Sequence, residues 1–207
     1  SAGMIRTLTF SSLYPNAVMP RHGIFVENRL RHLLATNDVG TRVIAPVPWF
    51  PLEHERFGYY SKFAKVPLHE YRHGIEIDHP RYPLMPKVGM SAAPWMMASA
   101  MFGVLKRLIR EGSDFALIDA HYFYPDGVAA ALLGDWLKKP VIITARGDDI
   151  NLIPDYFIPR HWIKWAARRC AGIITVCDAL RTRLIELGVE PRKIRTLRNG
   201  VDLALFR

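Results

Sequence analysis

The chain has 207 residues, of which 50% are hydrophobic and 23% are charged. This length supports one sizeable domain with a hydrophobic core or two very small ones, and this composition excludes a disordered chain. A net charge of +9 favours anionic partners such as phosphorylated small molecules, nucleic acid or anionic lipid headgroups, and a basic but otherwise ordinary surface is an equally good interpretation. Because the sequence has no zinc-finger spacing, no aromatic RNA-recognition motif and no long basic run, we expect no nucleic-acid partner.

The start of the chain and its cysteines bear on the compartment. Residues 1–3 precede Met4, and we expect them to be vector-derived. A predicted strand follows directly and leaves no room for a signal peptide. Cys170 and Cys177 are the only cysteines, and we expect both to be small buried hydrophobic residues rather than a disulfide or a metal site. These features predict a cytoplasmic protein.

Alternating strand and helix patterns occupy the first half of the chain. In order, they predict a strand over 4–10, a helix over 24–36, a strand over 41–47, a short strand within 74–82 and a helix over 91–110. Pro94 falls in the first turn of the last helix, where proline is tolerated. The proline- and aromatic-rich stretch 46–73 shows no clear period and is interpreted as a functional or mobile loop.

The same alternation continues to the end of the chain. In order, the patterns predict a strand over 116–120, a helix over 126–137, a strand over 140–144, a helix over 159–169, a strand over 172–176, a helix over 179–187 capped by Asp178, and a short strand over 194–197. Regular alternation of this kind is typical of a parallel sheet. We therefore expect an α/β fold: a Rossmann-like, doubly wound, mostly parallel sheet with helices on both faces.

Candidate site residues stand where predicted strands and loops end. Gly23, after Arg21 and His22, opens a predicted helix whose unpaired N–H groups and dipole favour an anion. The spacing is not GxGxxG, so a simple turn glycine is an equally good interpretation. His121 follows the strand over 116–120, where a structural and a catalytic role are both open.

Arg146, Asp148 and Asp149 form the densest charged group at the end of any predicted strand. An arginine fixed at the carboxyl end of a strand suits binding of a phosphate or a carboxylate. Neighbouring side chains point apart, so we expect at most one of the two aspartates in the cleft. The alternative is a solvated charged turn. Asp126 is interpreted as a helix N-cap and nothing more.

Four blocks of sequence follow one another in a characteristic order. They read PRHGIFV at 20–26, LIDAH followed by PDGVAA between 117 and 130, PVIITARGDD at 140–149, and ITVC followed by RNGVD between 174 and 202. Together they resemble the N-terminal domain of family 4 (group 1) glycosyltransferases, which have the GT-B fold. The resemblance implies that 4–207 is the acceptor-side Rossmann-like domain and that the family's C-terminal donor-binding domain is absent from the chain.

The resemblance also implies an activity. We expect the N-terminal domain of a retaining, hexosyltransferase-type enzyme that moves a sugar from a nucleotide-sugar donor to a glycan or lipid-linked acceptor, in bacterial cell-envelope polysaccharide synthesis. No cofactor and no metal ion are expected, and the domain alone should be inactive. The alternatives are another GT-B enzyme, such as a nucleotide-sugar 2-epimerase, and a non-catalytic ligand-binding domain.

On the donor side, the resemblance assigns Gly23 to the approach of the donor diphosphate. Arg21 and His22 precede it and Asn199 belongs to the last block, so these are the further residues expected near the donor. Arg198 stands before Asn199 where the family commonly has proline, which is a departure from the pattern.

The expected catalytic residues are Arg146, Asp149 and His121. Asp149 matches the aspartate of the family motif, whereas Arg146 stands where the family usually has a histidine near the reacting sugar. An arginine stays charged at neutral pH and cannot act as a general base. We therefore expect Arg146 to orient phosphate or acceptor groups.

The predicted helix over 91–110 bears on the acceptor. Many relatives use lipid-linked or membrane-borne acceptors, and the side chains that could line an acceptor groove, or touch an anionic membrane at its inner face, are Trp95, Met96, Met97, Met101 and Phe102. The alternative, which we favour, is that these side chains pack on the sheet. Residues 88–105 are uncharged, but their glycine, proline and alanine content predicts a packed helix rather than a transmembrane one.

Overall fold

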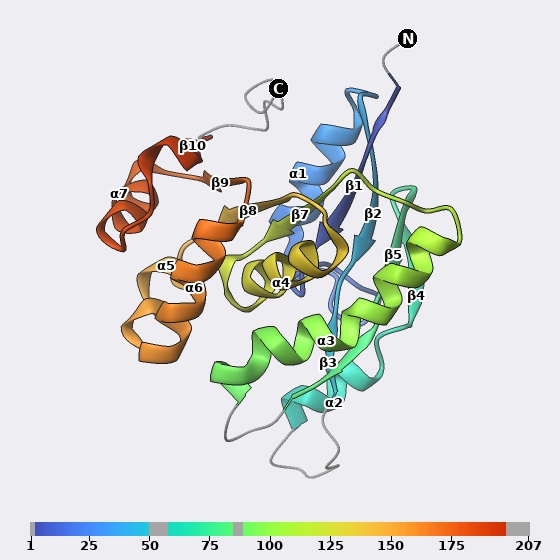
Figure 1. Cartoon of the computed structure of the whole chain (residues 1–207). Helices are drawn as coiled ribbons and strands as arrows, with labels where there is room; N and C mark the ends of the chain where they lie inside the picture. Colours follow the sequence, from blue (N-terminus) through green and yellow to red (C-terminus); the bar gives the residue numbers. More distant parts are fainter. Residues whose placement is uncertain (1–2, 50–57, 85–88, 198–207) are drawn as a thin grey trace.

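The computed structural model describes residues 3–49, 58–84 and 89–197 (Figure 1). Its centre is a sheet of eight strands in the order β10-β9-β8-β7-β1-β2-β5-β4. All neighbouring pairs are parallel except β4 with β5. The strands are β1 (Ile5–Phe10), β2 (Val39–Ile44), β4 (His69–Arg72), β5 (Ile75–Asp78), β7 (Leu117–His121), β8 (Val141–Ala145), β9 (Gly172–Thr175) and β10 (Ile194–Thr196). The predicted α/β fold is confirmed.

Helices cover both faces of this sheet. They are α1 (Ile24–Leu34), α2 (Gly58–Ala64), α3 (Gly89–Arg110), α4 (Val128–Leu137), α5 (Asp148–Asn151), α6 (Phe157–Arg169) and α7 (Asp178–Glu186). Val43 and Ile44 are neighbours on β2, so their side chains point to opposite faces. Val43 belongs to the small hydrophobic cluster under α1, and Ile44 belongs to the large cluster built with α3, α4, α6 and α7.

The chain winds away from β1 in two directions. β1 lies between β2 and β7, so β2, β5 and β4 extend the sheet on one side and β7 to β10 extend it on the other. Open α/β sheets bind ligands where the direction of winding changes, outside the carboxyl ends of the strands. Here that point lies at the ends of β1 and β7, beside the end of β8.

The stretch 46–73, predicted as one loop, contains regular structure on both sides of 50–57, which lie outside the described residues. β3 (Val47–Trp49) pairs with β6 (Arg81–Pro83) in a separate parallel sheet of two strands, and α2 and β4 also fall in this stretch. The interpretation as a loop is wrong for these parts. A strand of three residues is too short to show a period.

Two predicted helix caps and the predicted burial of one cysteine are corrected. α4 begins at Val128, after a π-helical turn over Phe123–Gly127, so Asp126 is not its N-cap. α7 begins at Asp178 itself, with Cys177 in the N-cap position. Cys177 is exposed, and only Cys170 is buried as predicted.

Pro94 is an interior residue of α3 rather than a first-turn residue, because the helix begins at Gly89. A proline has no N–H, so the carbonyl of Met90, one turn earlier, loses its helical partner. The hydroxyl of Tyr124 donates a hydrogen bond to this carbonyl. The proline is therefore accommodated because a side chain from outside the helix supplies the missing donor.

Most of the apolar side chains named for α3 pack inward. Met97 and Met101 are fully buried, and Phe102 packs edge-on against Trp136 with ring centroids 5.6 Å apart. The prediction that this helix packs on the sheet is confirmed, although Trp95 remains exposed. No helix in the described part of the chain is long and apolar enough to cross a membrane.

Candidate functional site

The candidate site lies where the winding reverses. β7 ends at His121, which is paired in register with Thr144 of β8, and Arg146 follows β8 directly. The loop after β1 leads to Gly23 and the first turn of α1. Three separate parts of the chain therefore bring the predicted residues to one edge of the sheet.

The guanidinium of Arg146 has a defined position. Its Nη2 lies 2.9 Å from Nδ1 of His121, and the group stacks 4.8 Å from the centroid of the Phe25 ring. Burial, followed by repulsion from Arg29, lowers the pKa of Arg146 to about 10, so it keeps its charge at neutral pH. Its buried Nε has no hydrogen-bond partner among the described residues.

His121 is neutral and carries its proton on Nε2. A guanidinium can only donate, so Nδ1 of His121 accepts from Arg146. Nε2 then donates to Asp119, whose Oδ2 lies 3.3 Å away. Burial lowers the pKa of His121, which agrees with a neutral ring. Because both ring nitrogens are occupied, the ring in this arrangement supports Arg146 instead of offering a free base.

Asp119 is the negative centre of the site. Burial alone would raise its pKa, but His121, Arg29 and Arg146 together hold it below the ordinary value. Arg29 donates from Nη1 to Oγ1 of Thr144 at 3.0 Å, and burial lowers the pKa of Arg29. Two guanidinium groups thus stand beside one carboxylate. Asp149 also acts electrostatically on Arg146, so the site holds acidic as well as basic groups. The positioned guanidinium groups are the part of it that suits an anionic ligand group.

Four of these residues were not predicted as site residues: Phe25, Arg29, Asp119 and Thr144. Phe25 and Arg29 lie four positions apart and so share one face of α1. Phe25 is exposed and lies off the buried stripe of this helix, which includes Val26. The sequence pattern that could have identified them is an aromatic residue outside the apolar stripe, one turn before an arginine.

The side chain of Asp149 holds the turn after β8 by binding main-chain N–H groups. Its carboxylate accepts hydrogen bonds from the N–H groups of Phe123 at 2.6 Å, Arg146 at 3.1 Å and Gly147 at 2.8 Å. Burial raises the pKa of Asp149, and these donors oppose that rise. Its neighbour Asp148 is exposed, so the two adjacent side chains have different surroundings, and the expectation that at most one of them enters the cleft stays a prediction.

Asp126 organises the loop after β1. Its buried carboxylate accepts from the backbone N–H of Ser12 at 2.8 Å and from the Ser12 hydroxyl at 2.9 Å. His22 Nε2 in turn donates to the Ser12 carbonyl at 3.2 Å, and burial lowers the pKa of His22. Asp126, interpreted from the sequence as a cap alone, thus ties the loop that leads to Gly23 to the start of α4.

We expect the stability conferred by Asp126 to fall as pH rises. Burial raises its pKa to about 7 from an ordinary value of 3.8, so between these two values the folded state keeps a proton that the unfolded state releases. The slope of unfolding free energy against pH is therefore negative in this window, and the loss amounts to roughly 2–4 kcal/mol. Asp126→Asn should remove this slope in urea denaturation between pH 5 and 8, whereas Asp148→Asn should retain it. Parallel wild-type and Asp126→Asn curves would contradict the assignment.

Gly23 is required by the packing of its own loop. It adopts φ 65° at the N-cap of α1, and a Cβ there would lie 2.4 Å from the backbone carbonyl of Leu13. Its predicted approach to a diphosphate stays a prediction. Arg21 is exposed beside it, and Asn199, the remaining predicted donor residue, lies outside the described residues.

The fold defines a class of protein. Anabaena HepE in complex with UDP matches 99% of this chain and 46% of its own length, with a TM-score of 0.53 and 15% identity. The UDP-GlcNAc 2-epimerase from Neisseria meningitidis bound to UDP-GlcNAc matches 93% of this chain and 46% of its own, with a TM-score of 0.56 and 13% identity. At such identities the likeness shows the fold alone, a Rossmann-like domain of the GT-B type.

Sequence comparison gives the family. Residues 26–205 match the model of Glycosyltransferase Family 4, and the chain belongs to this family. The glycosyltransferase TuaC of Bacillus subtilis, assigned to teichuronic acid biosynthesis, is 31% identical over 211 residues that cover 98% of this chain and 51% of TuaC. The uncharacterized glycosyltransferase MJ1178 of Methanocaldococcus jannaschii is 32% identical over 94 residues, or 45% of this chain and 26% of MJ1178. The chain thus spans about half the length of TuaC, and the predicted family is confirmed.

Proposed function

We propose that this chain is the acceptor-side, N-terminal domain of a retaining glycosyltransferase that transfers a sugar from a nucleotide-sugar donor to a glycan or lipid-linked acceptor in cell-envelope polysaccharide synthesis. The observation that carries the proposal is the guanidinium of Arg146, which His121 and Asp119 fix at the winding reversal, because a positioned guanidinium suits a phosphate group. The name of the relative TuaC supports a polysaccharide product. The UDP bound in the structural neighbour HepE supports a nucleotide-sugar donor.

The described contacts suggest a division of roles within the site. Arg146 is the residue that touches the reacting groups, and it orients a donor phosphate or the acceptor. His121 and Asp119 act through Arg146 as positioning residues, because their hydrogen bonds fix its guanidinium. Asp149 positions the main chain of the turn. The turn at Gly23 supplies the approach to the donor diphosphate.

The donor is held mainly by a C-terminal domain beyond this chain, and the reaction proceeds without a metal ion or a cofactor. It follows that the isolated chain binds nucleotide sugars weakly and does not catalyse transfer. Calorimetry on the 207-residue chain tests this division of roles. Micromolar affinity for a nucleotide sugar would contradict it.

The neighbouring 2-epimerase structures make nucleotide-sugar epimerisation the second candidate. That reaction moves a proton on the sugar and needs acid/base groups facing it. In the described part of the chain, the buried carboxylates of Asp126 and Asp149 are both committed to hydrogen bonds with N–H or O–H donors. Asp119 is not committed in this way, because its Oδ1 has no hydrogen-bond partner among the described residues. The preference for transfer over epimerisation therefore rests on the family to which the chain belongs.

The deciding experiment incubates the whole protein that contains this chain with labelled UDP-sugars, with and without a cell-envelope acceptor fraction. We expect transfer to the acceptor, with retained anomeric configuration and unchanged rate in EDTA. Turnover of the nucleotide sugar without acceptor would support the epimerase. Ligand binding without any turnover would support a non-catalytic domain.

A cytoplasmic location with peripheral contact to an anionic membrane is part of this proposal. The net charge of +9 supports such contact, because basic side chains are attracted to anionic headgroups. A lipid-linked acceptor would also require the site to work close to the bilayer surface.

A further inference from the structure

Helix α6 has an unusual outer face. Its sequence, FIPRHWIKWAARR, contains four arginine or lysine residues and no acidic residue. The outer positions recur at i, i+4, i+7 and i+11 and are Phe157, His161, Lys164 and Arg168. Arg168 lies in the last turn, where a basic side chain stabilises a helix, but Lys164 lies one turn earlier and repels it.

The start of α6 exposes large apolar side chains. They are 49–66% exposed and lie just before the helix or in its first two residues: Leu152, Tyr156, Phe157 and Ile158. A single exposed apolar residue is ordinary on a soluble protein, whereas four large ones within seven consecutive residues are the composition of an interaction surface.

The first turns of α3 extend this apolar group. Trp162 of α6 donates from Nε1 to the Ser91 carbonyl at 2.9 Å, which holds the two helix starts together. Figure 1 shows both starts at the same corner of the molecule. Met90 and Trp95 of α3 are exposed there. The acidic residue nearest in sequence, Asp155, is paired with Arg183 at 3.6 Å.

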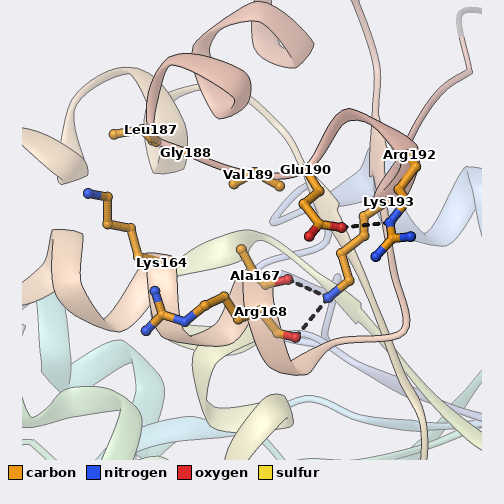
Figure 2. A pocket seen from close by; sticks show the side chains of 9 residues that line it. All are labelled: Lys164, Ala167, Arg168, Leu187, Gly188, Val189, Glu190, Arg192 and Lys193. Atoms are coloured by element: carbon orange, nitrogen blue, oxygen red, sulfur yellow. Dashed lines mark hydrogen bonds and ion pairs between the residues drawn. The ribbon is translucent and has the colours of Figure 1, made fainter.

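A groove of about 590 Å³ adjoins the basic end of the same face (Figure 2). It lies between α6 and residues 187–193, and Lys164 and Arg168 line it. Lys193 is engaged with the carbonyls at the end of α6, at 2.9 and 2.8 Å, and Arg192 is paired with Glu190 at 2.6 Å. Within the described residues, the side chains of Lys164 and Arg168 have no such partner.

We propose that the outer face of α6, with the apolar residues at its start and at the start of α3, docks on an anionic lipid bilayer. Phe157 and Ile158 enter the boundary between headgroups and acyl chains, and Lys164 and Arg168 bind headgroup phosphates. An aromatic and aliphatic end followed by a basic stripe is the composition of helices that lie in a membrane interface. A soluble polyanion would satisfy the basic stripe and leave the apolar end exposed, so the bilayer fits better.

This inference rests on the proposed function in one respect, the nature of the acceptor. Leu152 follows Arg146 by six residues, so the docking face begins at the same sheet edge as the site. A bilayer at this face would present the headgroup of a lipid-linked acceptor toward Arg146.

The test is co-sedimentation of the 207-residue chain with vesicles of phosphatidylcholine alone or mixed with phosphatidylglycerol, at low salt. We expect binding that requires phosphatidylglycerol and weakens as salt rises. The double variant Phe157→Ser/Ile158→Ser should bind roughly tenfold more weakly. Lys164→Gln/Arg168→Gln should weaken binding to vesicles with phosphatidylglycerol by a similar factor. It should not change binding to vesicles of phosphatidylcholine alone.

Matched controls distinguish an effect of the proposed docking surface from a general effect of net charge or of exposed apolar side chains. Arg107→Gln/Arg110→Gln removes the same charge from the exposed far end of α3, and Ile185→Ser removes an exposed apolar residue from α7. Both should bind vesicles like the wild type, with unchanged circular dichroism for every variant. Equal loss in test and control variants, or no preference for phosphatidylglycerol, would overturn the proposal.

A soluble polyanion is the rival occupant. If heparin binds the chain and the Phe157→Ser/Ile158→Ser variant binds vesicles like the wild type, the face serves a polyanion and the membrane proposal is wrong. Transfer to a soluble acceptor by the whole enzyme reports separately on the proposed function. Vesicle binding and transfer can therefore fail independently.

Discussion

Replacing Arg146 with alanine in the whole enzyme is expected to lower kcat/KM by about 100- to 1000-fold, the usual effect of removing one preorganised donor from a charged reaction centre. The guanidinium is fixed by His121 on one side and by the Phe25 ring on another, so its loss removes a positioned charge rather than a mobile one. Arg146→Lys keeps the charge but loses the planar fork, and we expect it to recover only part of the activity. Steady-state transfer assays measure both effects.

The control for Arg146 must remove an arginine without touching the site. Arg107 is exposed near the end of α3, and Arg107→Ala should leave transfer unchanged. His121→Gln should lower kcat/KM by less than Arg146→Ala, because it loosens the guanidinium without removing it. Full activity in Arg146→Ala would take Arg146 out of the site.

Replacing Asp149 with alanine is expected to destabilise the fold by about 3 kcal/mol or more. Its carboxylate satisfies the N–H groups of Phe123, Arg146 and Gly147, and a buried donor left without a partner costs about 1–3 kcal/mol. Urea denaturation of the 207-residue chain measures the loss.

Asp148→Ala is the matched control for Asp149. The two residues are adjacent and carry the same charge, but Asp148 is exposed, so its replacement should change stability by less than about 0.5 kcal/mol. Equal losses in the two variants would show that the buried carboxylate does not hold the turn.

The fold was largely predictable because its signals are local. Strands such as β8, with the sequence VIITA, are short and β-branched, and the helices between them carry a regular apolar stripe. The positions of His121 and Arg146 at one edge also followed, since parallel strands present their carboxyl ends together. Such patterns do not detect short elements such as β3, and they do not fix the exact starts of α4 and α7.

The contacts within the site were not predictable in the same way. Ser12 and Asp126 are 114 positions apart in the chain, and Arg29 and Thr144 are 115 apart. Alternation of strands and helices does not determine which strands become neighbours, so it cannot pair such residues. Asp126 therefore resembled a local helix cap, although its partner belongs to another loop.

The turn after β8 is held through its peptide groups. Asp149 grips the N–H of residue 146 and not its side chain, and a change of side chain at 146 leaves that grip in place. The side chain at position 146 can thus be exchanged without a change in the backbone of the turn. Arg146→His should therefore fold as well as the wild type. Because Asp149 fixes the backbone of the turn, the side chain at position 146 can vary without a change in the fold.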